Sequence, residues 1–221
     1  MTATWPSSLK PSQITDPELV ASYATGGRTS NGLEQRVLSD AGYWRLSYTF
    51  AIRSREQVLA WRALVTRMKA GEAVVATVYD MHRATGADAA GSSATVLSPV
   101  PIGSVSALVA IYGIEAEPGA MFSIGDRLYR VVAVTAPGEA QDNWLDADAW
   151  TGGEPWPAPT LGVTPVQLWF LPPLRAAAPA GTRLSFQNLR LQCWPEGLSS
   201  IPLDLDLGKF ADPTLTLVEA L

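Results

Sequence analysis

The stretch YWRLSYTFAI, residues 43–52, carries the clearest structural signal in the chain. Its aromatic and aliphatic side chains occupy every second position, and Arg45, Ser47 and Thr49 lie between them. A period of two is typical of a β-strand with one buried and one solvated face. The stretch therefore predicts a β-strand and favours a mainly β protein.

The segments before this strand predict less regular structure. Residues 33–38 (LEQRVL) indicate another strand, and residues 39–42 (SDAG) have the composition of a hairpin loop joining it to 43–52. Residues 1–24 are rich in proline and serine, and a residue that precedes proline favours extended backbone. We therefore expect an extended N-terminal arm with one short strand at 19–23.

One amphipathic helix is predicted at about residues 55–70. Ser54 and Gln57 have the spacing of a capping box, in which each side chain satisfies a backbone donor of the first turn. Gly71 is expected to end the helix. The apolar side chains recur at helical spacing and predict packing against a sheet: Val58, Trp61, Leu64, Val65 and Met68.

The rest of the chain predicts short strands joined by turns. Residues 74–79 and 106–114 are expected to be strands, whereas 83–98, rich in Ala, Gly, Ser and Thr, is expected to be an exposed loop. Residues 122–134 predict a tight hairpin that turns at Gly125-Asp126. Further strand signals follow at 166–171, 183–186, 189–194, 203–207 and 215–217.

This pattern predicts a β-sandwich or barrel with one helix. The segment that begins at residue 119 differs in character from what precedes it. We therefore divide the chain into the arm (1–24), a β domain containing the helix (25–118) and a second β module (119–221) packed on the first.

Composition excludes several classes of protein. The chain is 47% hydrophobic and 17% charged, which is typical of a globular protein. Its net charge of −5 and its scattered Lys and Arg argue against sequence-specific nucleic-acid binding. No uninterrupted apolar run approaches 18 residues and no signal peptide is recognisable, so we expect no membrane insertion and synthesis in the cytoplasm.

Candidate catalytic and metal-binding residues are few. Cys193 is the single cysteine, and its apolar neighbours favour a buried side chain in a strand. His82 is the single histidine and falls at the start of a predicted loop. A nucleophile would depend on that one base, and a zinc site would need carboxylates to complete it. We therefore expect no enzyme activity, metal or other cofactor.

The loop at 136–163 combines acidic residues with tryptophans and allows three interpretations. Asp142, Asp146, Asp148 and Glu154 alternate with Trp144, Trp150 and Trp156. A protein interface is favoured, because catalytic carboxylates need rigid support that a Gly/Pro-rich loop does not supply. Carbohydrate contact is the second interpretation and glycoside hydrolysis the third. A calcium site at Asp146 and Asp148 lacks the rest of an EF-hand loop.

Tryptophans in irregular segments suggest an interface, because tryptophan is enriched at the energetic centres of protein contacts. In the arm, Trp5 and Leu9 are expected to dock on a partner surface. The predicted interface set is therefore Trp5, Leu9, Trp144, Trp150 and Trp156.

Five segments resemble small tail proteins of long-tailed (siphovirus-type) phages. They are distributed along most of the chain: WPSSLKP at 5–11, GGRTSNGLEQRVLSDAGYWR at 26–45, FSIGDRLYRVVAV at 122–134, PPLR at 172–175 and KFADPTLTLVEAL at 209–221. The nearest family is the distal tail protein, the adaptor ring between the tail tube and the tail tip or baseplate.

This resemblance implies a structural virion protein without catalytic residues. It implies a hexameric ring formed by the domain at 25–118, with a second β module of galectin-like shape. The expected partners are other copies of the chain, the tail tube protein and the tail-tip or hub proteins, and the expected location is the virion tail tip. The alternatives are another structural role (tail terminator, head–tail connector or minor tail-tip protein) and a carbohydrate-binding module.

Overall fold

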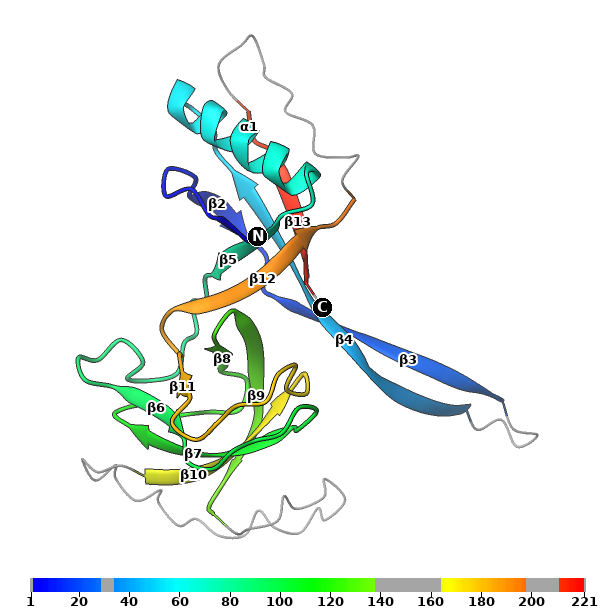
Figure 1. The fold of residues 1–221 in the computed structure, drawn as a ribbon, viewed down its shortest axis with the longest axis vertical. Helices are drawn as coiled ribbons and strands as arrows, with labels where there is room; N and C mark the ends of the chain where they lie inside the picture. Colours follow the sequence, from blue (N-terminus) through cyan, green and yellow to red (C-terminus); the bar gives the residue numbers. More distant parts are fainter. Residues whose placement is uncertain (1, 29–33, 138–163, 198–210, 221) are drawn as a thin grey trace. The chain divides into compact units, whose positions relative to one another are not determined.

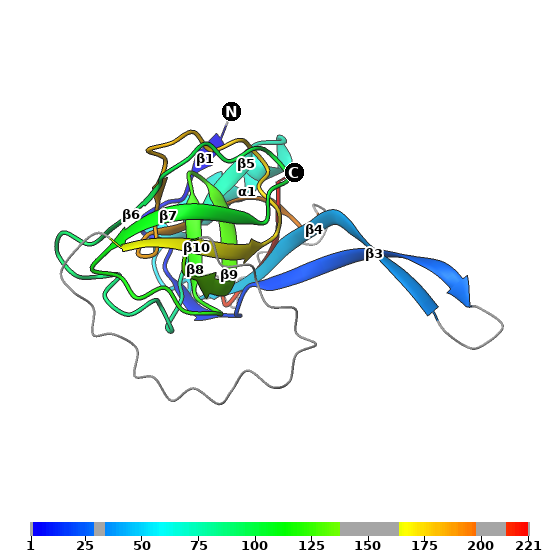
Figure 2. The ribbon, with the colours of Figure 1, turned by 90° about the horizontal axis from the view of Figure 1, so that it is seen from below.

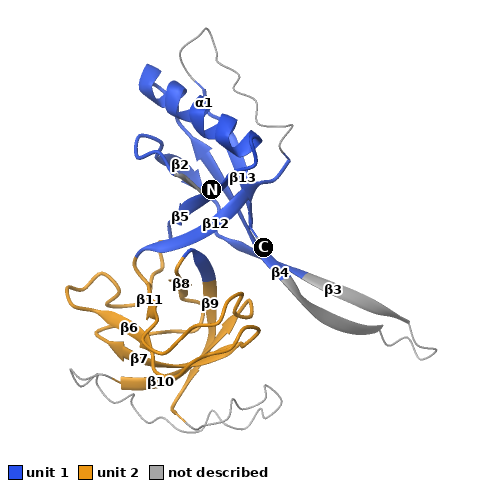
Figure 3. Ribbon diagram, viewed as in Figure 1, with its two compact units in different colours: residues 1–80, 126–128, 188–221 blue, residues 81–125, 129–187 orange. Residues whose placement is uncertain are grey.

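The computed structural model describes residues 2–28, 34–137, 164–197 and 211–220. The chain is mostly β, and the described residues contain two sheets and a single helix (Figure 1). The chain divides into two compact units (Figure 3). Unit 1 comprises Met1–Asp80, Asp126–Leu128 and Asn188–Leu221, and unit 2 comprises Met81–Gly125 and Tyr129–Gln187. The predicted fold class is confirmed.

Unit 1 is built on a seven-stranded sheet in the order β1-β5-β12-β13-β4-β2, and β3 also pairs with β4. The pairs are antiparallel except β1 with β5. The strands are β1 (Thr2–Thr4), β2 (Pro11–Ile14), β3 (Glu18–Arg28), β4 (Glu34–Phe50), β5 (Ala73–Val78), β12 (Leu189–Pro195) and β13 (Thr214–Glu219).

The alternating stretch at 43–52 forms the inner half of β4. Trp44, Leu46, Tyr48 and Phe50 are buried, as the period of two predicts. The predicted hairpin loop at 39–42 is wrong, because β4 continues through it. Its backbone is paired with β3 on both sides of this segment, and these long-range hydrogen bonds override the turn propensity of SDAG.

Helix α1 (Arg55–Lys69) confirms the predicted helix almost residue for residue. The Ser54–Gln57 capping box is present, with the Gln57 N–H donating to Ser54 Oγ at 3.2 Å. The buried side chains of the helix are Trp61, Leu64 and Met68. Trp61 meets Phe50 of β4 at a ring-centroid distance of 5.2 Å, so the helix covers the buried face of the sheet.

Unit 2 holds a six-stranded sheet that forms a near-closed barrel, and Figure 2 shows several of its strands from below. Its order is β11-β6-β7-β10-β9-β8. Ser123 of β8 and Ser185, just after β11, exchange backbone hydrogen bonds of 2.8 and 2.9 Å and join the two edges. The strands are β6 (Ser93–Val96), β7 (Ser106–Tyr112), β8 (Met121–Ile124), β9 (Arg127–Thr135), β10 (Thr164–Leu171) and β11 (Arg183–Leu184).

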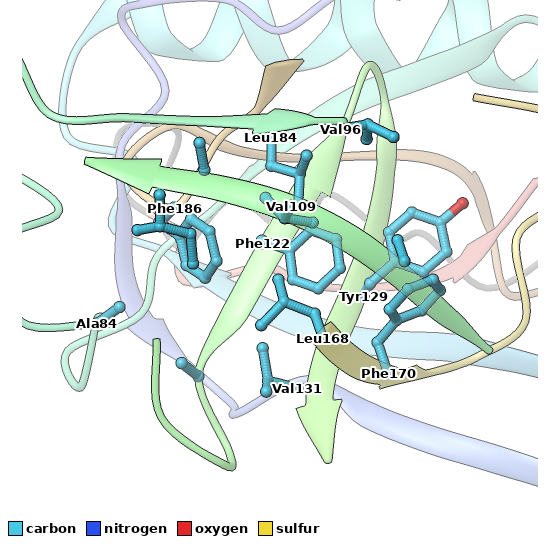
Figure 4. Packing of buried hydrophobic residues seen from close by; sticks show 14 of the residues in the cluster. Ala84, Val96, Val109, Phe122, Tyr129, Val131, Leu168, Phe170, Leu184 and Phe186 are labelled. Atoms are coloured by element: carbon cyan, nitrogen blue, oxygen red, sulfur yellow. The ribbon is translucent and has the colours of Figure 1, made fainter. Parts of the chain in front are cut away.

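Aromatic rings fill the centre of this barrel (Figure 4). Phe122 is fully buried, and its ring centroid lies within 5.5 Å of those of Tyr129, Phe170 and Phe186. The same core contains small and medium apolar side chains from the segment at 83–98: Ala84, Ala87, Ala94 and Val96.

The prediction of an exposed loop at 83–98 is therefore wrong. The segment contains β6, and three of its five alanines, Ala84, Ala87 and Ala94, belong to the barrel core. The hairpin predicted at 122–134 is confirmed: β8 and β9 flank Gly125, which has the positive φ of 59° that favours glycine.

The compact units divide the chain differently from the predicted boundary at 118/119. The strands on both sides of the barrel segment, β5 and β12, pair with each other in unit 1, for example Val78 with Leu189. Sheet pairing between distant segments thus makes unit 1 discontinuous in sequence. Residues 126–128, at the start of β9, also belong to unit 1.

Candidate assembly surface

Two of the five predicted interface residues lie side by side in unit 1. Leu9 is a core residue, only 3% exposed, and Trp5 is half-buried. Trp5 Nε1 donates to the Leu9 carbonyl at 2.9 Å, and the Trp5 ring lies 5.8 Å from Tyr48 and 5.6 Å from Phe50. The remaining members of the set, Trp144, Trp150 and Trp156, lie outside the described residues.

The N-terminal segment is integrated into the sheet of unit 1. Thr2–Thr4 pair with Ala73–Val75 of β5, and Pro11–Ile14 pair with β4. The prediction of an extended arm at 1–24 with one short strand is therefore wrong: three strands begin in that range. Trp5 and Leu9 explain the difference, because the Trp5 ring packs beside Tyr48 and Phe50 of β4 and Leu9 is buried in the core.

The outer half of the β3–β4 pair is the first candidate surface, and we call it the β3–β4 ribbon. It comprises residues 22–28 and 34–39, paired from Ser22–Ser39 to Arg28–Glu34. On β4, β13 pairs only with residues 45–49 and β2 only with 48–50. Among the described strands, therefore, the ribbon pairs only with itself and leaves both of its outer backbone edges without a strand partner.

The second candidate surface is an exposed apolar loop of the barrel, residues 97–105. Leu97, Ile102 and Val105 are 46%, 67% and 38% exposed, and the prolines at 99 and 101 are exposed between them. No charged residue occurs from residue 89 to 114. These exposed, uncharged apolar side chains make the loop a candidate contact surface.

The 97–105 loop is held rigidly by backbone hydrogen bonds to residues 172–182. Val100 and Ala178 exchange two bonds of 2.8 and 2.9 Å. The Gly103 N–H donates to the Leu174 carbonyl, and the Leu174 N–H donates to the Ser104 carbonyl, both at 2.8 Å. A surface held in this way loses little conformational entropy on binding. The absence of charged residues from 89 to 114 is the sequence signal for this surface. The predicted exposed loop ended at residue 98 and therefore missed most of it.

Cys193 and His82, the candidate catalytic residues, lie in a buried and an exposed position respectively. Cys193 is fully buried in β12, as predicted, and burial raises the pKa of its thiol, with the neighbouring Glu219 carboxylate raising it further. The thiolate required of a nucleophile is therefore disfavoured. His82 is exposed. Among the described residues, no cluster of three or more His, Cys, Asp or Glu side chains is arranged to hold a metal ion.

Glu219 is the buried carboxylate of unit 1, 4% exposed. It accepts from the Trp44 N–H at 3.2 Å and pairs with Arg127 at 3.3 Å. Trp44 Nε1 donates to the Leu128 carbonyl at 2.8 Å, and the Gln192 N–H donates to the Asp126 carbonyl at 2.8 Å. Together with the ion pair between Glu219 and Arg127, these backbone bonds hold residues 126–128 in unit 1.

In the part of the chain that the structure describes, no helix is long and apolar enough to cross a membrane. No protein-family model matches the chain, and no curated protein matches it in sequence.

Proposed function

We propose that this chain is a structural protein of a phage tail: the distal tail protein, which forms a hexameric ring between the tail tube and the tail tip. The sequence segments that resemble such proteins motivate the proposal. The observation that carries it is the β3–β4 ribbon, a long strand pair whose outer backbone edges have no partner among the described strands.

A two-stranded ribbon is marginally stable in water when it packs on nothing else. Exposed strand edges also invite pairing with other chains, so proteins normally cover or shorten them. A ribbon retained at this length is best explained by a partner that completes it. Addition of strands from a neighbouring copy satisfies the edge donors and acceptors directly.

A contact of this kind uses different surfaces on the two copies, so it generates a ring when the rotation closes. Six copies would match a six-fold tail tube. The acidic character of the chain suits a ring around a DNA channel, because like charge keeps the genome from adhering to the wall.

The 97–105 loop supports a second contact, with a different protein. Its exposed apolar side chains belong to unit 2, whereas the ribbon belongs to unit 1. We assign the ribbon to contacts between copies and the loop to a neighbouring tail protein, either the tail tube protein or a tail-tip or hub protein.

Reconstruction of tailed particles by electron cryo-microscopy tests the proposal. We expect six copies of the chain in one ring at the distal end of the tail tube, with the β3–β4 ribbon at each subunit contact. A three-fold arrangement would move the chain to the central tip, and a twelve-fold arrangement would move it to the head–tail connector. Either result would refute the adaptor-ring function.

A screen of the purified protein on polysaccharides and peptidoglycan provides a second test. We expect no turnover, because the Cys193 thiol is fully buried and burial raises its pKa, which disfavours the thiolate that a nucleophile needs. Hydrolysis that is lost in Asp146→Ala would overturn the structural function in favour of an enzyme.

A further inference from the structure

Three cations form a stripe on the exposed face of helix α1. Arg55, Arg62 and Lys69 are seven residues apart and all exposed. With 3.6 residues per turn they lie within about 40° of one line along the helix, spaced roughly 10 Å apart. We call these three residues the cationic stripe. Leu59, 47% exposed, lies between the first two.

The stripe is not neutralised within its own helix. Glu56 is the only acid between Arg55 and Lys69, and it stands one residue from Arg55, which is not a facing position. Arg67 pairs instead with Glu72 at 2.8 Å and Arg53 with Asp212 at 2.6 Å. The described residues show no ion pair for the three stripe cations.

Helix stability does not explain the stripe. Arg55 occupies the first turn, where the helix dipole disfavours a positive charge by about 0.3–1 kcal/mol at exposed sites. Only Lys69, in the last turn, is favoured by the dipole. The positive charges of Arg55 and Arg62 therefore gain no stabilisation from the helix dipole.

The charge of this segment is opposite to that of the rest of the chain. Between Arg53 and Lys69 there are five cations and one anion, a net charge of +4. Because the whole chain carries −5, the remainder carries −9. A polyanion such as DNA meets attraction at the helix and a net negative charge in the rest of the chain, whereas a second copy carries carboxylates that can pair with the stripe.

We propose that the cationic stripe of α1 binds an acidic surface on a second copy of this chain. This inference deepens the proposed ring and rests on it. The acceptor is the loop of unit 2 that carries Glu115 and Glu117. Both are exposed, and neither takes part in an ion pair among the described residues.

The acceptor loop has a fixed shape. The Glu115 N–H donates to the Thr85 carbonyl at 2.8 Å, and the Ala120 N–H donates to the Glu117 carbonyl at 3.1 Å. No cation precedes it in sequence back to Arg83, which is paired with Asp88. Two unpaired carboxylates on a rigid loop match two cations of the stripe in number and charge.

A pair of charge-matched double variants tests this contact. Arg55→Glu with Arg62→Glu and Arg183→Glu with Arg190→Glu both change the net charge from −5 to −9, so their general repulsion is equal. Sedimentation velocity of the full chain measures self-association. We expect Arg55→Glu with Arg62→Glu, the helix variant, to weaken self-association by about tenfold or more. Arg183→Glu with Arg190→Glu, the strand variant, should weaken it by less than about threefold. Association of the unmodified chain is expected to weaken as salt rises to about 0.5 M.

The acceptor is tested by charge exchange. Glu115→Lys with Glu117→Lys is expected to weaken self-association about as much as the helix variant. Combining the two sets is expected to restore it to within about threefold of the unmodified chain. Absence of recovery would overturn the pairing with this loop. Circular dichroism of each variant checks that the fold is retained.

Other outcomes separate this inference from the ring itself. Equal weakening by both double variants, or a chain that stays monomeric at low salt, overturns the inference, while a six-fold ring in particles would still support the proposed function. Duplex DNA or phosphatidylserine vesicles serve as competing probes. If one of these probes binds the unmodified chain but not the Arg55→Glu, Arg62→Glu variant, and that variant self-associates as before, the partner of the cationic stripe is not a second copy. The partner is then a nucleic acid or a membrane, according to the probe.

Discussion

In unit 2 the first and last strands of the sheet meet through Ser123 and Ser185, whereas in unit 1 the sheet ends at β1 on one side and at β2 and β3 on the other. Closure leaves the barrel without free strand edges at that join. The open sheet of unit 1 keeps the β3–β4 ribbon, whose edges have no partner among the described strands.

This difference separates two ways of meeting other proteins. A closed barrel offers side chains, and unit 2 presents the exposed apolar residues of its 97–105 loop. An open sheet also offers backbone donors and acceptors, which a neighbouring strand pairs with directly. The contrast predicts that the stability of unit 2 depends on its core, while the ribbon of unit 1 serves association more than folding.

The largest effect is expected from Phe122→Ala in the barrel core. Phe122 is fully buried and touches three other rings, so its removal should cost about 3–5 kcal/mol of unfolding free energy. Hydrogen exchange of the β7 and β10 amides measures this loss locally. Leu97→Ala, at a 46% exposed position, is the control and should cost less than about 1 kcal/mol. A small effect at Phe122 would mean that the barrel is not held by this aromatic centre.

Leu9→Ala should destabilise unit 1 by about 2–4 kcal/mol, because Leu9 is 3% exposed in its core. Denaturant unfolding followed by tryptophan fluorescence measures the change. Lys10→Ala, at the exposed neighbouring position, is the matched control. Unchanged stability with weakened association would return Leu9 to the interface assigned from the sequence.

Glu219→Gln is expected to cost about 2–3 kcal/mol, since it leaves the quarter-exposed Arg127 without its buried carboxylate. Glu196→Gln breaks the solvent-exposed pair with Arg45 and should cost no more than about 1 kcal/mol. Urea midpoints of the two variants compare a buried with an exposed ion pair. Equal midpoints would show that burial adds nothing to the Glu219 interaction.

The smallest change in stability is expected from shortening the ribbon. Replacing residues 23–38 with Asn-Gly joins Ser22 to Ser39, which face each other in register, through a favoured two-residue turn. The melting temperature of unit 1 should shift by less than about 5 °C, while ring assembly into particles is lost. Retained assembly would show that the ribbon is dispensable for contacts between copies.

Elements with local signals could be predicted from the sequence. Helix α1 has a capping box and a stripe at 3.6-residue spacing, and the β8–β9 hairpin has Gly125 at its turn. Each signal lies within the element that it specifies. The alternation at 43–52 likewise identified the buried face of β4.

Features set by distant partners could not be predicted in this way. Residues 39–42 have the composition of a turn, yet pairing with β3 keeps them extended. Ala84, Ala87 and Ala94 carry little apolar surface of their own, and only the folded barrel shows that they belong to the same core as the aromatic rings. The surroundings of Trp5 are a further example, because its ring lies beside Tyr48 and Phe50, which are more than 40 residues away in sequence.

The position of β13 between β12 and β4 has a consequence for synthesis on the ribosome. All residues of the barrel emerge before β12 and β13, so unit 2 has its whole sequence while unit 1 still lacks the strands that fill its centre. At typical translation rates, roughly 7–30 s separate the exit of β5 from that of β13. Throughout that interval Trp44, Leu46 and Tyr48 have no partner strand on the β13 side, although the ribbon has already emerged. A nascent chain thus exposes the edges of the β3–β4 ribbon before the core of unit 1 can form. Binding of a chaperone, or early folding of the barrel, would keep nascent chains on the same messenger RNA from pairing prematurely.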